Sequence, residues 1–113
     1  MKFDKQFIED VLVISIEGEI MGGPEEDDFR HIIDEAIQNE QIKIVLDLAN
    51  AKWMNSSGLG MLIRALTVLR SSEGDLKLAN VSERIRRPIE ITRLNAVLLI
   101  YDSINQAVQS YKE

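Results

Sequence analysis

Five stretches of the chain carry the apolar spacing of β-strands. In residues 11–17, Leu12, Ile14 and Ile16 alternate with other positions, so their side chains would share one face of a strand. A shorter strand would precede it and pair with it through a turn near Glu9-Asp10. Two later stretches are almost continuously apolar, which is typical of strands buried on both faces. The predicted strands span residues 2–7, 11–17, 42–48, 76–81 and 97–101.

Four other stretches carry helical spacing or follow a capping residue, and they alternate with the strands. Pro24 suits the first turn of a helix, and Glu25, Glu26 and Asp27 would lie at its positive end. Ser82 is a plausible cap for a short helix that contains Pro88. The predicted helices run from Pro24 to Ile37, over 83–92 and over 103–112, and a further one, whose buried face begins at Leu59, ends near residues 71–74.

This order of elements predicts the fold class. Strands that alternate with helices indicate a largely parallel sheet with right-handed crossovers. The chain has no linker, repeat or low-complexity segment, so we expect one domain over residues 1–113. The predicted fold is α/β, with a mixed sheet whose central strands are mostly parallel and which about four helices flank.

Composition and charge exclude several classes of site. The chain has no cysteine and one histidine, His31, which removes disulfides, thiolate metal sites, a cysteine nucleophile and a His-rich metal site. A formal net charge of −6 would repel a nucleic-acid backbone, so no nucleic-acid partner is expected. The small cluster Arg84, Arg86 and Arg87 is a local exception, which we interpret as the solvated face of one short segment. No metal or cofactor is predicted.

The sequence indicates a cytoplasmic protein without membrane insertion. Its first residues form no apolar signal region, and no stretch approaches the roughly 20 apolar residues that span a bilayer. The glycosylation pattern Asn55-Ser56-Ser57 would then not be used, because that modification needs a secreted chain.

The stretch Trp53-Met54-Asn55-Ser56-Ser57-Gly58-Leu59-Gly60 is the main candidate for chemistry. It lies between a predicted strand and a helix, where ligand and partner sites of α/β sheets concentrate. Asn55 or Ser56 would cap the helix. Gly58 and Gly60 each cost a helix roughly 1 kcal/mol relative to alanine, which indicates a close approach to the backbone.

Three chemical readings of the serines remain beside capping. A nucleophile elbow would need a glycine two places before the serine, and His31 is the only imidazole base. A Walker loop would need a lysine where Met61 stands. The third reading is a regulatory phosphoacceptor, because a phosphate on Ser56 would lie at the positive end of a helix.

The string Val45-Leu46-Asp47-Leu48 followed by Asn55-Ser56-Ser57-Gly58-Leu59-Gly60 resembles the STAS domain of bacterial anti-sigma factor antagonists. In that family a strand and a short loop lead to Asp-Ser-Ser/Thr-Gly-Leu-Gly, so Asn55 stands in place of the usual Asp. Weaker similarities cover essentially the whole chain. They include residues 16–20, residues 76–82 and Ile91-Thr92-Arg93-Leu94.

The resemblance implies a regulatory protein and no enzyme. Ser56 would accept a phosphate from an anti-sigma factor that is also a serine kinase, and Ser57 would be its structural neighbour in a loop with Asn55, Gly58 and Gly60. The unphosphorylated protein would bind the kinase and displace a sigma factor. Phosphorylation would release the complex, and a PP2C-type phosphatase would reset the cycle.

A partner surface is expected beside Ser56. Met61, Ala65 and Val68 recur at i, i+4 and i+7 beside the predicted core face, a spacing equally compatible with packing at the edge of the core. An exposed tryptophan at the lip of this surface would be a natural hot spot for binding. The predicted partner residues are Met21, Trp53, Met54, Met61, Ala65 and Val68, on a protein that is a monomer when free.

Two alternative functions stay open at this stage. Because Asn55 lacks the carboxylate of the usual Asp, the chain is also compatible with a STAS adaptor that never accepts a phosphate. Such an adaptor would serve a transporter, a lipid-trafficking complex or a stress-sensing assembly. The other alternative is a small serine-dependent hydrolase, which would need His31 as its base.

Overall fold

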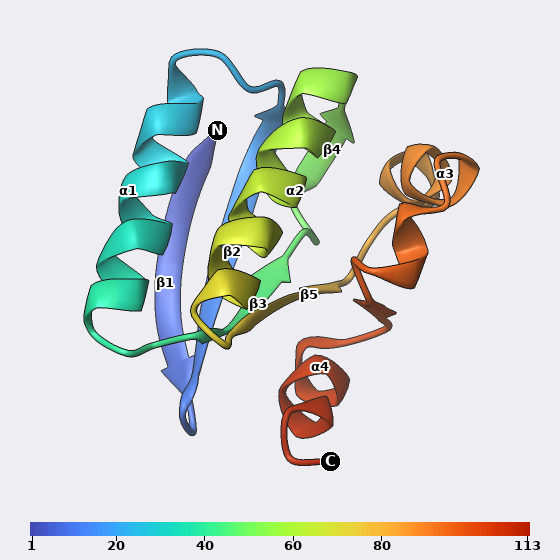
Figure 1. Ribbon diagram of the computed structural model, residues 1–113. Helices are drawn as coiled ribbons and strands as arrows, with labels where there is room; N and C mark the ends of the chain where they lie inside the picture. Colours follow the sequence, from blue (N-terminus) through green and yellow to red (C-terminus); the bar gives the residue numbers. More distant parts are fainter.

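The structure is a computed structural model that describes all of residues 1–113. Its six strands form a sheet in the order β1-β2-β3-β5-β6, with β4 paired to β2 (Figure 1). β1 and β2 are antiparallel, and all other pairings are parallel. The strands are β1 (Lys2–Ile8), β2 (Val11–Ile20), β3 (Lys43–Asp47), β4 (Ala51–Met54), β5 (Asp75–Ala79) and β6 (Ile100–Tyr101).

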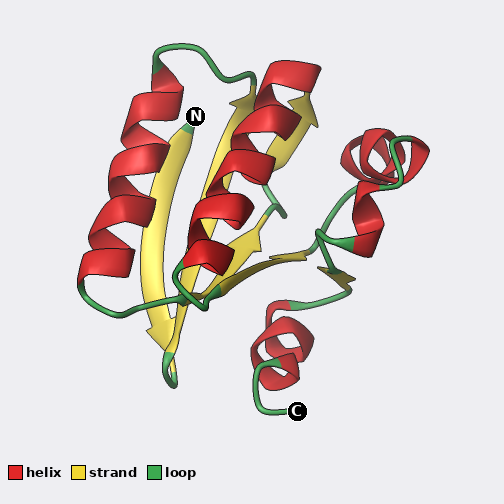
Figure 2. Ribbon diagram, viewed as in Figure 1, coloured by secondary structure: helices red, strands yellow, loops and turns green.

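Helices cover both faces of this sheet. α1 and α2 lie side by side on one face, α4 packs on the other, and α3 packs beside β4 (Figures 1 and 2). None of them combines the length and the apolar character that a membrane-spanning helix needs. The helices are α1 (Glu25–Gln38), α2 (Ser56–Ser71), α3 (Glu83–Ile91) and α4 (Ile104–Ser110), with a 3-10 turn at Leu94–Ala96.

Alternation along β2 divides the core into two unequal clusters. Leu12 and Ile14 belong to a cluster of 23 buried residues that includes Phe29 of α1. Val11 and Val13 point to the opposite face and join a cluster of six buried residues under α4. Because successive side chains of a strand face opposite sides, one strand supplies both layers. The larger layer lies under α1 and α2, so these two helices pack on the larger part of the core.

The architecture confirms the predicted α/β fold with a mostly parallel mixed sheet and four helices. One strand, β4, was not predicted. It has only four residues, and its Lys52 and Trp53 break any apolar alternation. β4 exists because β2 extends beyond its pairing with β3. The last residues of β2, 18–20, pair with β4 after a register shift between Gly18 and Glu19. The serine motif therefore follows β4 and not β3.

Two details near the C-terminus also differ from the prediction. The strand expected over residues 97–101 is confined to Ile100–Tyr101, because residues 94–96 form the 3-10 turn. Ser82 occupies the N-cap position of α3, but its side chain makes no capping hydrogen bond.

The side chain of Tyr111 joins the end of α4 to the middle of the sheet. Its hydroxyl donates to the carbonyl oxygen of Ile44 (2.6 Å) and accepts from the Ile44 N–H (3.2 Å). The Lys77 ammonium lies 4.0 Å from the centre of the Tyr111 ring and donates to Ser110 Oγ at 2.7 Å. Lys77 is only 7% exposed, but its buried ammonium group has partners, namely a hydroxyl acceptor and an aromatic face.

We expect Tyr111→Phe to lower the free energy of unfolding by about 1–2 kcal/mol near neutral pH, because two hydrogen bonds to a buried strand are lost. Burial, with the charge of Asp75, raises the pKa of the Tyr111 phenol in the folded chain. The folded state thus holds the phenol proton more tightly than the unfolded state does.

The wild-type contribution should be complete below the unfolded tyrosine pKa of about 10 and decline as the pH rises further. Urea unfolding of both proteins at neutral and alkaline pH measures the difference. A wild type and variant that lose stability in parallel above that pH would contradict the role of Tyr111.

Candidate functional site

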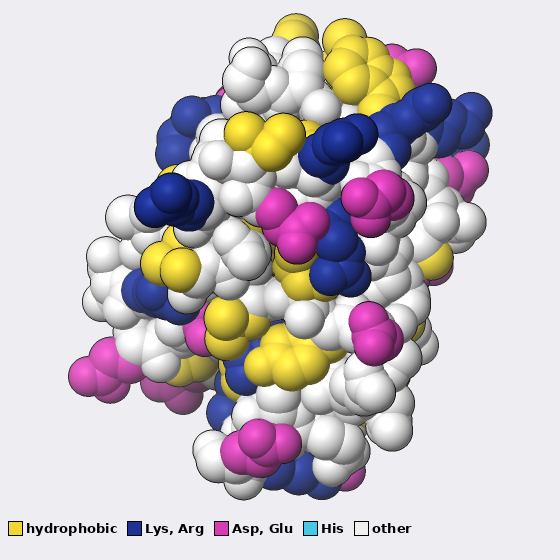
Figure 3. All heavy atoms as spheres, turned by 90° about the vertical axis from the view of Figure 1, so that its right-hand side faces the viewer, with side chains coloured by type: hydrophobic (Ala, Val, Ile, Leu, Met, Phe, Trp, Pro, Cys, Tyr) yellow, Lys and Arg dark blue, Asp and Glu magenta, His cyan; other side chains and the backbone are white.

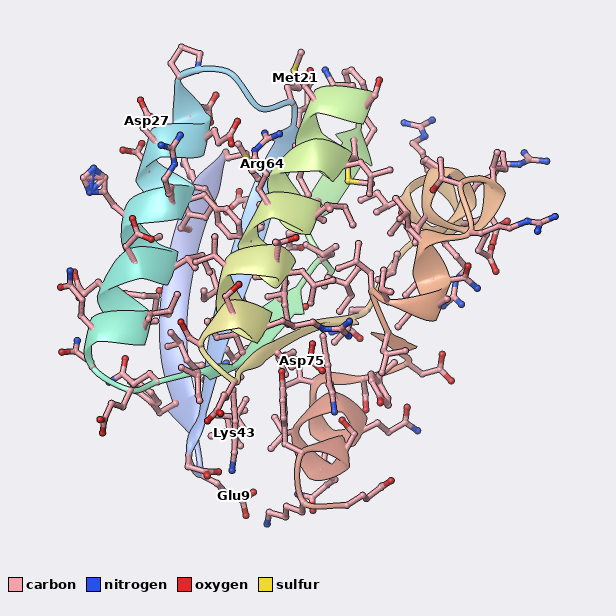
Figure 4. All side chains as sticks on the ribbon, viewed as in Figure 1. Glu9, Met21, Asp27, Lys43, Arg64 and Asp75 are labelled. Atoms are coloured by element: carbon pink, nitrogen blue, oxygen red, sulfur yellow. The ribbon has the colours of Figure 1, made fainter.

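Ser56 is the first residue of α2 and lies at the end of the sheet where β2 and β4 finish. The segment after β2 runs past it, and Figure 4 shows Met21 beside the first turn of α2. Met21 is 43% exposed, and the side chains of Ser56 and Ser57 are exposed as well. The strand order therefore gathers the loop after β2 and the start of α2 into one accessible surface.

Of the two cap candidates in the sequence, Asn55 and Ser56, it is Asn55 that caps α2. Its backbone is extended, and its side-chain oxygen accepts a hydrogen bond from the Gly58 N–H at 2.8 Å. Its carbonyl accepts from Leu59 (2.9 Å), and its own N–H donates to the carbonyl of Ile20 at 3.2 Å. An amide oxygen is sufficient for this cap, so replacing the family's Asp with Asn preserves the geometry of the helix start.

Gly58 is required by the fold of the chain itself. A Cβ atom at this position would overlap the carbonyl oxygen of Ile20 and lie 2.6 Å from its carbonyl carbon. The predicted close approach to the backbone is thus real, and the approaching group is the end of β2. Gly60 differs, because a Cβ there would lie 3.2 Å from Nη1 of Arg64, the mobile end of a long side chain.

The loop after β2 packs against Ser57. Gly22 has a φ of +75°, a conformation that other residues rarely adopt, and a Cβ on it would lie 3.1 Å from the Ser57 Cβ. Ser57 therefore contacts the neighbouring loop, which agrees with a structural role for it. Neither its hydroxyl nor that of Ser56 makes a hydrogen bond within the chain.

The arrangement lacks the parts of a serine hydrolase. His31, the one imidazole, is exposed on α1 and makes no hydrogen bond to either hydroxyl. The structure also contains no group of three or more His, Cys, Asp or Glu that could hold a metal ion.

The first N–H groups of α2 have no partner within the helix, so this end is electropositive. The site is chemically suited to carry an anion close to an accessible hydroxyl.

A bidentate ion pair fastens α1 to α2 beside the site. The Arg64 guanidinium donates from Nε and from Nη2 to the two carboxylate oxygens of Glu26, each at 2.7 Å. These hydrogen bonds hold the pKa of the Glu26 carboxyl below its ordinary value. Figure 4 shows Arg64 between the two helices. Sequence analysis missed this pair, for which the only signal was acidic residues at the start of α1.

Three residues expected on the partner surface are buried. Met54, Met61 and Ala65 are 6%, 1% and 7% exposed, respectively, so the prediction that they lie outside the core is wrong. For Met61 and Ala65 the reason is the position of α1, because they line the space between α1 and α2 together with Phe29. Met54, the last residue of β4, packs into the larger core cluster. The spacing i, i+4 was real, but it marks a second packed side of the helix.

The remaining residues of the predicted surface are accessible. Val68 is 44% exposed, Met21 is 43% exposed, and Trp53 is half-buried on β4. Val68 lies 12 residues along α2 from Ser56, which corresponds to about 18 Å at the helical rise. Met21 and Trp53 belong to the end of the sheet that carries Ser56, whereas Val68 lies toward the other end of the helix.

Comparison with known proteins connects this site to a family. A profile of the STAS domain matches residues 2–107. The anti-sigma F factor antagonist of Paenibacillus polymyxa is 32% identical over 94 residues, which cover 82% of this chain and 80% of that protein. The anti-sigma-B factor antagonist of Listeria monocytogenes is 38% identical over 72 residues, 60% of this chain and 63% of that protein.

Solved structures share the fold over nearly the whole chain. TM1081 of Thermotoga maritima superposes with a TM-score of 0.89 at 25% identity, covering 98% of this chain and 95% of that one. SpoIIAA of Bacillus in its phosphorylated form gives 0.74 at 20% identity, with 97% and 99% covered. The unphosphorylated form of SpoIIAA gives the same TM-score, with 97% and 96% covered.

The two glycines of the motif should respond in opposite ways to alanine. Within a helix, Gly→Ala ordinarily stabilises by roughly 1 kcal/mol. We expect Gly60→Ala to gain part of that amount, because only the end of the Arg64 side chain, which also pairs with Glu26, must shift. Gly58→Ala should instead destabilise by about 2 kcal/mol or more, because the new methyl group meets backbone atoms of β2.

Urea unfolding of the wild type and both variants measures these changes. A Gly58→Ala protein as stable as Gly60→Ala would contradict the close packing of α2 on the end of β2.

Proposed function

The chain belongs to the STAS domain family, and we propose that it is an anti-sigma factor antagonist whose binding is switched off by phosphorylation of Ser56. The observation that carries the proposal is the state of this hydroxyl. It is exposed, makes no hydrogen bond within the chain, and stands on the first residue of a capped helix. The names of the relatives and the phosphorylated form of SpoIIAA, which shares the fold, support the same function.

In the proposed reaction, a serine kinase that is also the anti-sigma factor transfers the γ-phosphoryl group of ATP to Ser56. A bond forms between Ser56 Oγ and phosphorus, the bond to the bridging oxygen of ADP breaks, and the hydroxyl proton passes to a base of the kinase. A PP2C-type phosphatase hydrolyses the phosphoserine and restores the hydroxyl. The antagonist is the substrate in both steps and supplies no catalytic group.

The effect on binding follows from charge. Phosphorylation adds about −1.5 to −2 charges at pH 7. Within the free chain, the positive end of α2 favours this charge. In a complex, the same group would have to give up its water against a packed partner surface, which is costly unless the partner supplies a cation. The phosphorylated protein is therefore expected to be stable when free and weakened in binding.

Asn55 is compatible with the proposed mechanism. Its amide oxygen already makes the capping hydrogen bond to Gly58 at 2.8 Å, so Ser56 is positioned without a carboxylate. A neutral cap also avoids placing a negative charge next to the new phosphate. The kinase would have to orient its magnesium ion with its own residues, which is its usual means of holding the metal.

The proposed partner surface consists of the exposed residues around Ser56. Met21, in the loop after β2, and the half-buried Trp53 of β4 offer apolar and aromatic contact at the end of the sheet that carries Ser56. Tryptophan is enriched among residues that dominate binding energy, and methionine adapts to irregular surfaces. Binding at this surface would let a single phosphate disturb the centre of the contact.

The direct test is the modification itself. The protein is isolated with phosphatase inhibitors from cells that naturally carry it, and intact mass and fragment spectra are recorded. We expect one phosphate on Ser56, absent from a Ser56→Ala variant and retained by Ser57→Ala. A protein that never carries phosphate on either serine, across growth and stress conditions, would refute the switch and favour a constitutive STAS adaptor.

A second test measures the effect of charge on binding. Ser56→Glu should weaken binding to the anti-sigma factor by about 10-fold or more, since even a single carboxylate must be desolvated in the contact. Ser57→Glu is the matched control and should weaken binding less, because it adds the same charge one residue away from the hydroxyl that the partner is proposed to cover. Calorimetry with the purified anti-sigma factor measures the affinity of both variants. Equal losses of affinity would contradict a specific role for Ser56 in the contact.

A further inference from the structure

The arginines of the chain divide into two groups by their ion pairs. All three arginines outside residues 84–93 are paired: Arg30 with Asp27 at 3.3 Å, Arg64 with Glu26 at 2.7 Å, and Arg70 with Asp75 at 3.3 Å. The four arginines inside this segment have no carboxylate within 4.0 Å. These are Arg84, Arg86, Arg87 and Arg93.

Two of the unpaired arginines, Arg84 and Arg87, lie on the outer side of α3. Ile85 and Ile89 are fully buried and fix which side of the helix faces the core. Arg84, Arg87 and Ile91 follow at i, i+3 and i+7, so they share the opposite side. With Glu83 and Pro88 they line a shallow groove of about 580 Å³. Ile91 is 72% exposed, more than any other large hydrophobic residue.

Figure 3 shows this side of the molecule. Lys and Arg side chains lie in the upper half of the view, with hydrophobic atoms and some Asp and Glu side chains among them. Four arginines without ion pairs in one short segment stand out on a chain with a formal net charge of −6. Positive charges close together on one short segment repel one another, and these four arginines have no carboxylate partners in the chain. An anionic partner would relieve this repulsion.

We propose that this surface, formed by Arg84, Arg87 and Ile91 of α3, binds an acidic segment of a protein partner. Arginine presents a planar fork of donors that matches a carboxylate in two parallel hydrogen bonds. An apolar side chain of the same segment packs on Ile91, which would otherwise remain in water. The partner is thus a peptide segment that carries Asp or Glu next to an apolar residue.

The other anionic classes of partner fit less well. A membrane would receive a single exposed apolar side chain, Ile91, from a helix of nine residues, and the net charge of −6 on the remainder would oppose approach to anionic lipids. A nucleic-acid backbone meets the same repulsion over a much longer surface. A short acidic segment would contact little beyond the groove itself, where Arg84 and Arg87 outnumber Glu83.

The surface on α3 lies close to Ser56, but binding there does not depend on the proposed phosphorylation switch. α3 packs against β4, and β4 leads directly into Asn55 and Ser56. A partner that covers Ser56 would therefore have α3 within reach. The acidic segment would keep its contact with α3 whether or not Ser56 carries a phosphate, so binding of the segment is separable from the proposed switch.

The test uses a short fluorescent peptide of glutamate and leucine and the full-length chain. Fluorescence anisotropy measures binding by the wild type, Arg84→Gln/Arg87→Gln and the matched control Arg30→Gln/Arg70→Gln. The two double variants change the net charge equally, but only the first removes unpaired arginines. We expect about a 10-fold loss of affinity for the first and a loss below about 2-fold for the control.

Further variants separate the contributions of the surface. Ile91→Ser should weaken binding several-fold without a change in charge, and added salt should weaken binding by the wild type. Ser56→Ala should bind the peptide as the wild type does, so a failure of the switch and a failure of this surface give different results. Circular dichroism and urea unfolding establish that each variant is folded.

Four outcomes would overturn the proposal. One is equal loss of affinity in both double variants, which would show that only net charge matters. Another is no measurable binding of the peptide by the wild type. The third is binding to vesicles of phosphatidylcholine and phosphatidylglycerol that the α3 variant loses, without peptide binding. The fourth is self-association, seen by analytical ultracentrifugation and lost in the α3 variant, which would identify a second copy as the occupant.

Discussion

The contact between Gly58 and the carbonyl of Ile20 determines how the functional end of this protein is built. A helix start can lie directly on the end of a strand only where no side chain separates the two backbones. The same carbonyl accepts the N–H of Asn55, so the cap and the close approach are held by one residue of β2. The exposure of Ser56 depends on this arrangement, because burying one side of the first turn of α2 turns its other side to solvent.

Periodicity predicted the framework because the long elements each bury one continuous face. The alternation of Leu12, Ile14 and Ile16 and the helical spacing of Leu59, Leu62 and Leu66 correspond to real core positions. The cap at Asn55 was also predictable, since it depends on residues three positions apart. The fold class and the position of Ser56 at a helix start required no information from distant parts of the chain.

The remaining features depend on contacts between distant segments. β4 is a strand only because the end of β2 offers it a parallel partner, and its own four residues carry no pattern. Met61 and Ala65 are buried because α1 lies against α2, which a single helix cannot reveal. The pair between Arg64 and Glu26 joins residues 38 positions apart. In each case the second partner, and not the local sequence, determines the environment.

The two ends of the chain lie at opposite ends of the molecule. The Met1 ammonium pairs with Glu25 at the start of α1, at the end that carries Ser56, whereas the chain finishes after α4 at the far end (Figure 1). An affinity tag joined to Met1 would remove this ammonium group and place foreign residues beside the surface under study. A tag or immobilising linker joined to Glu113 would leave that surface free, so the C-terminus is the better point of attachment for binding measurements.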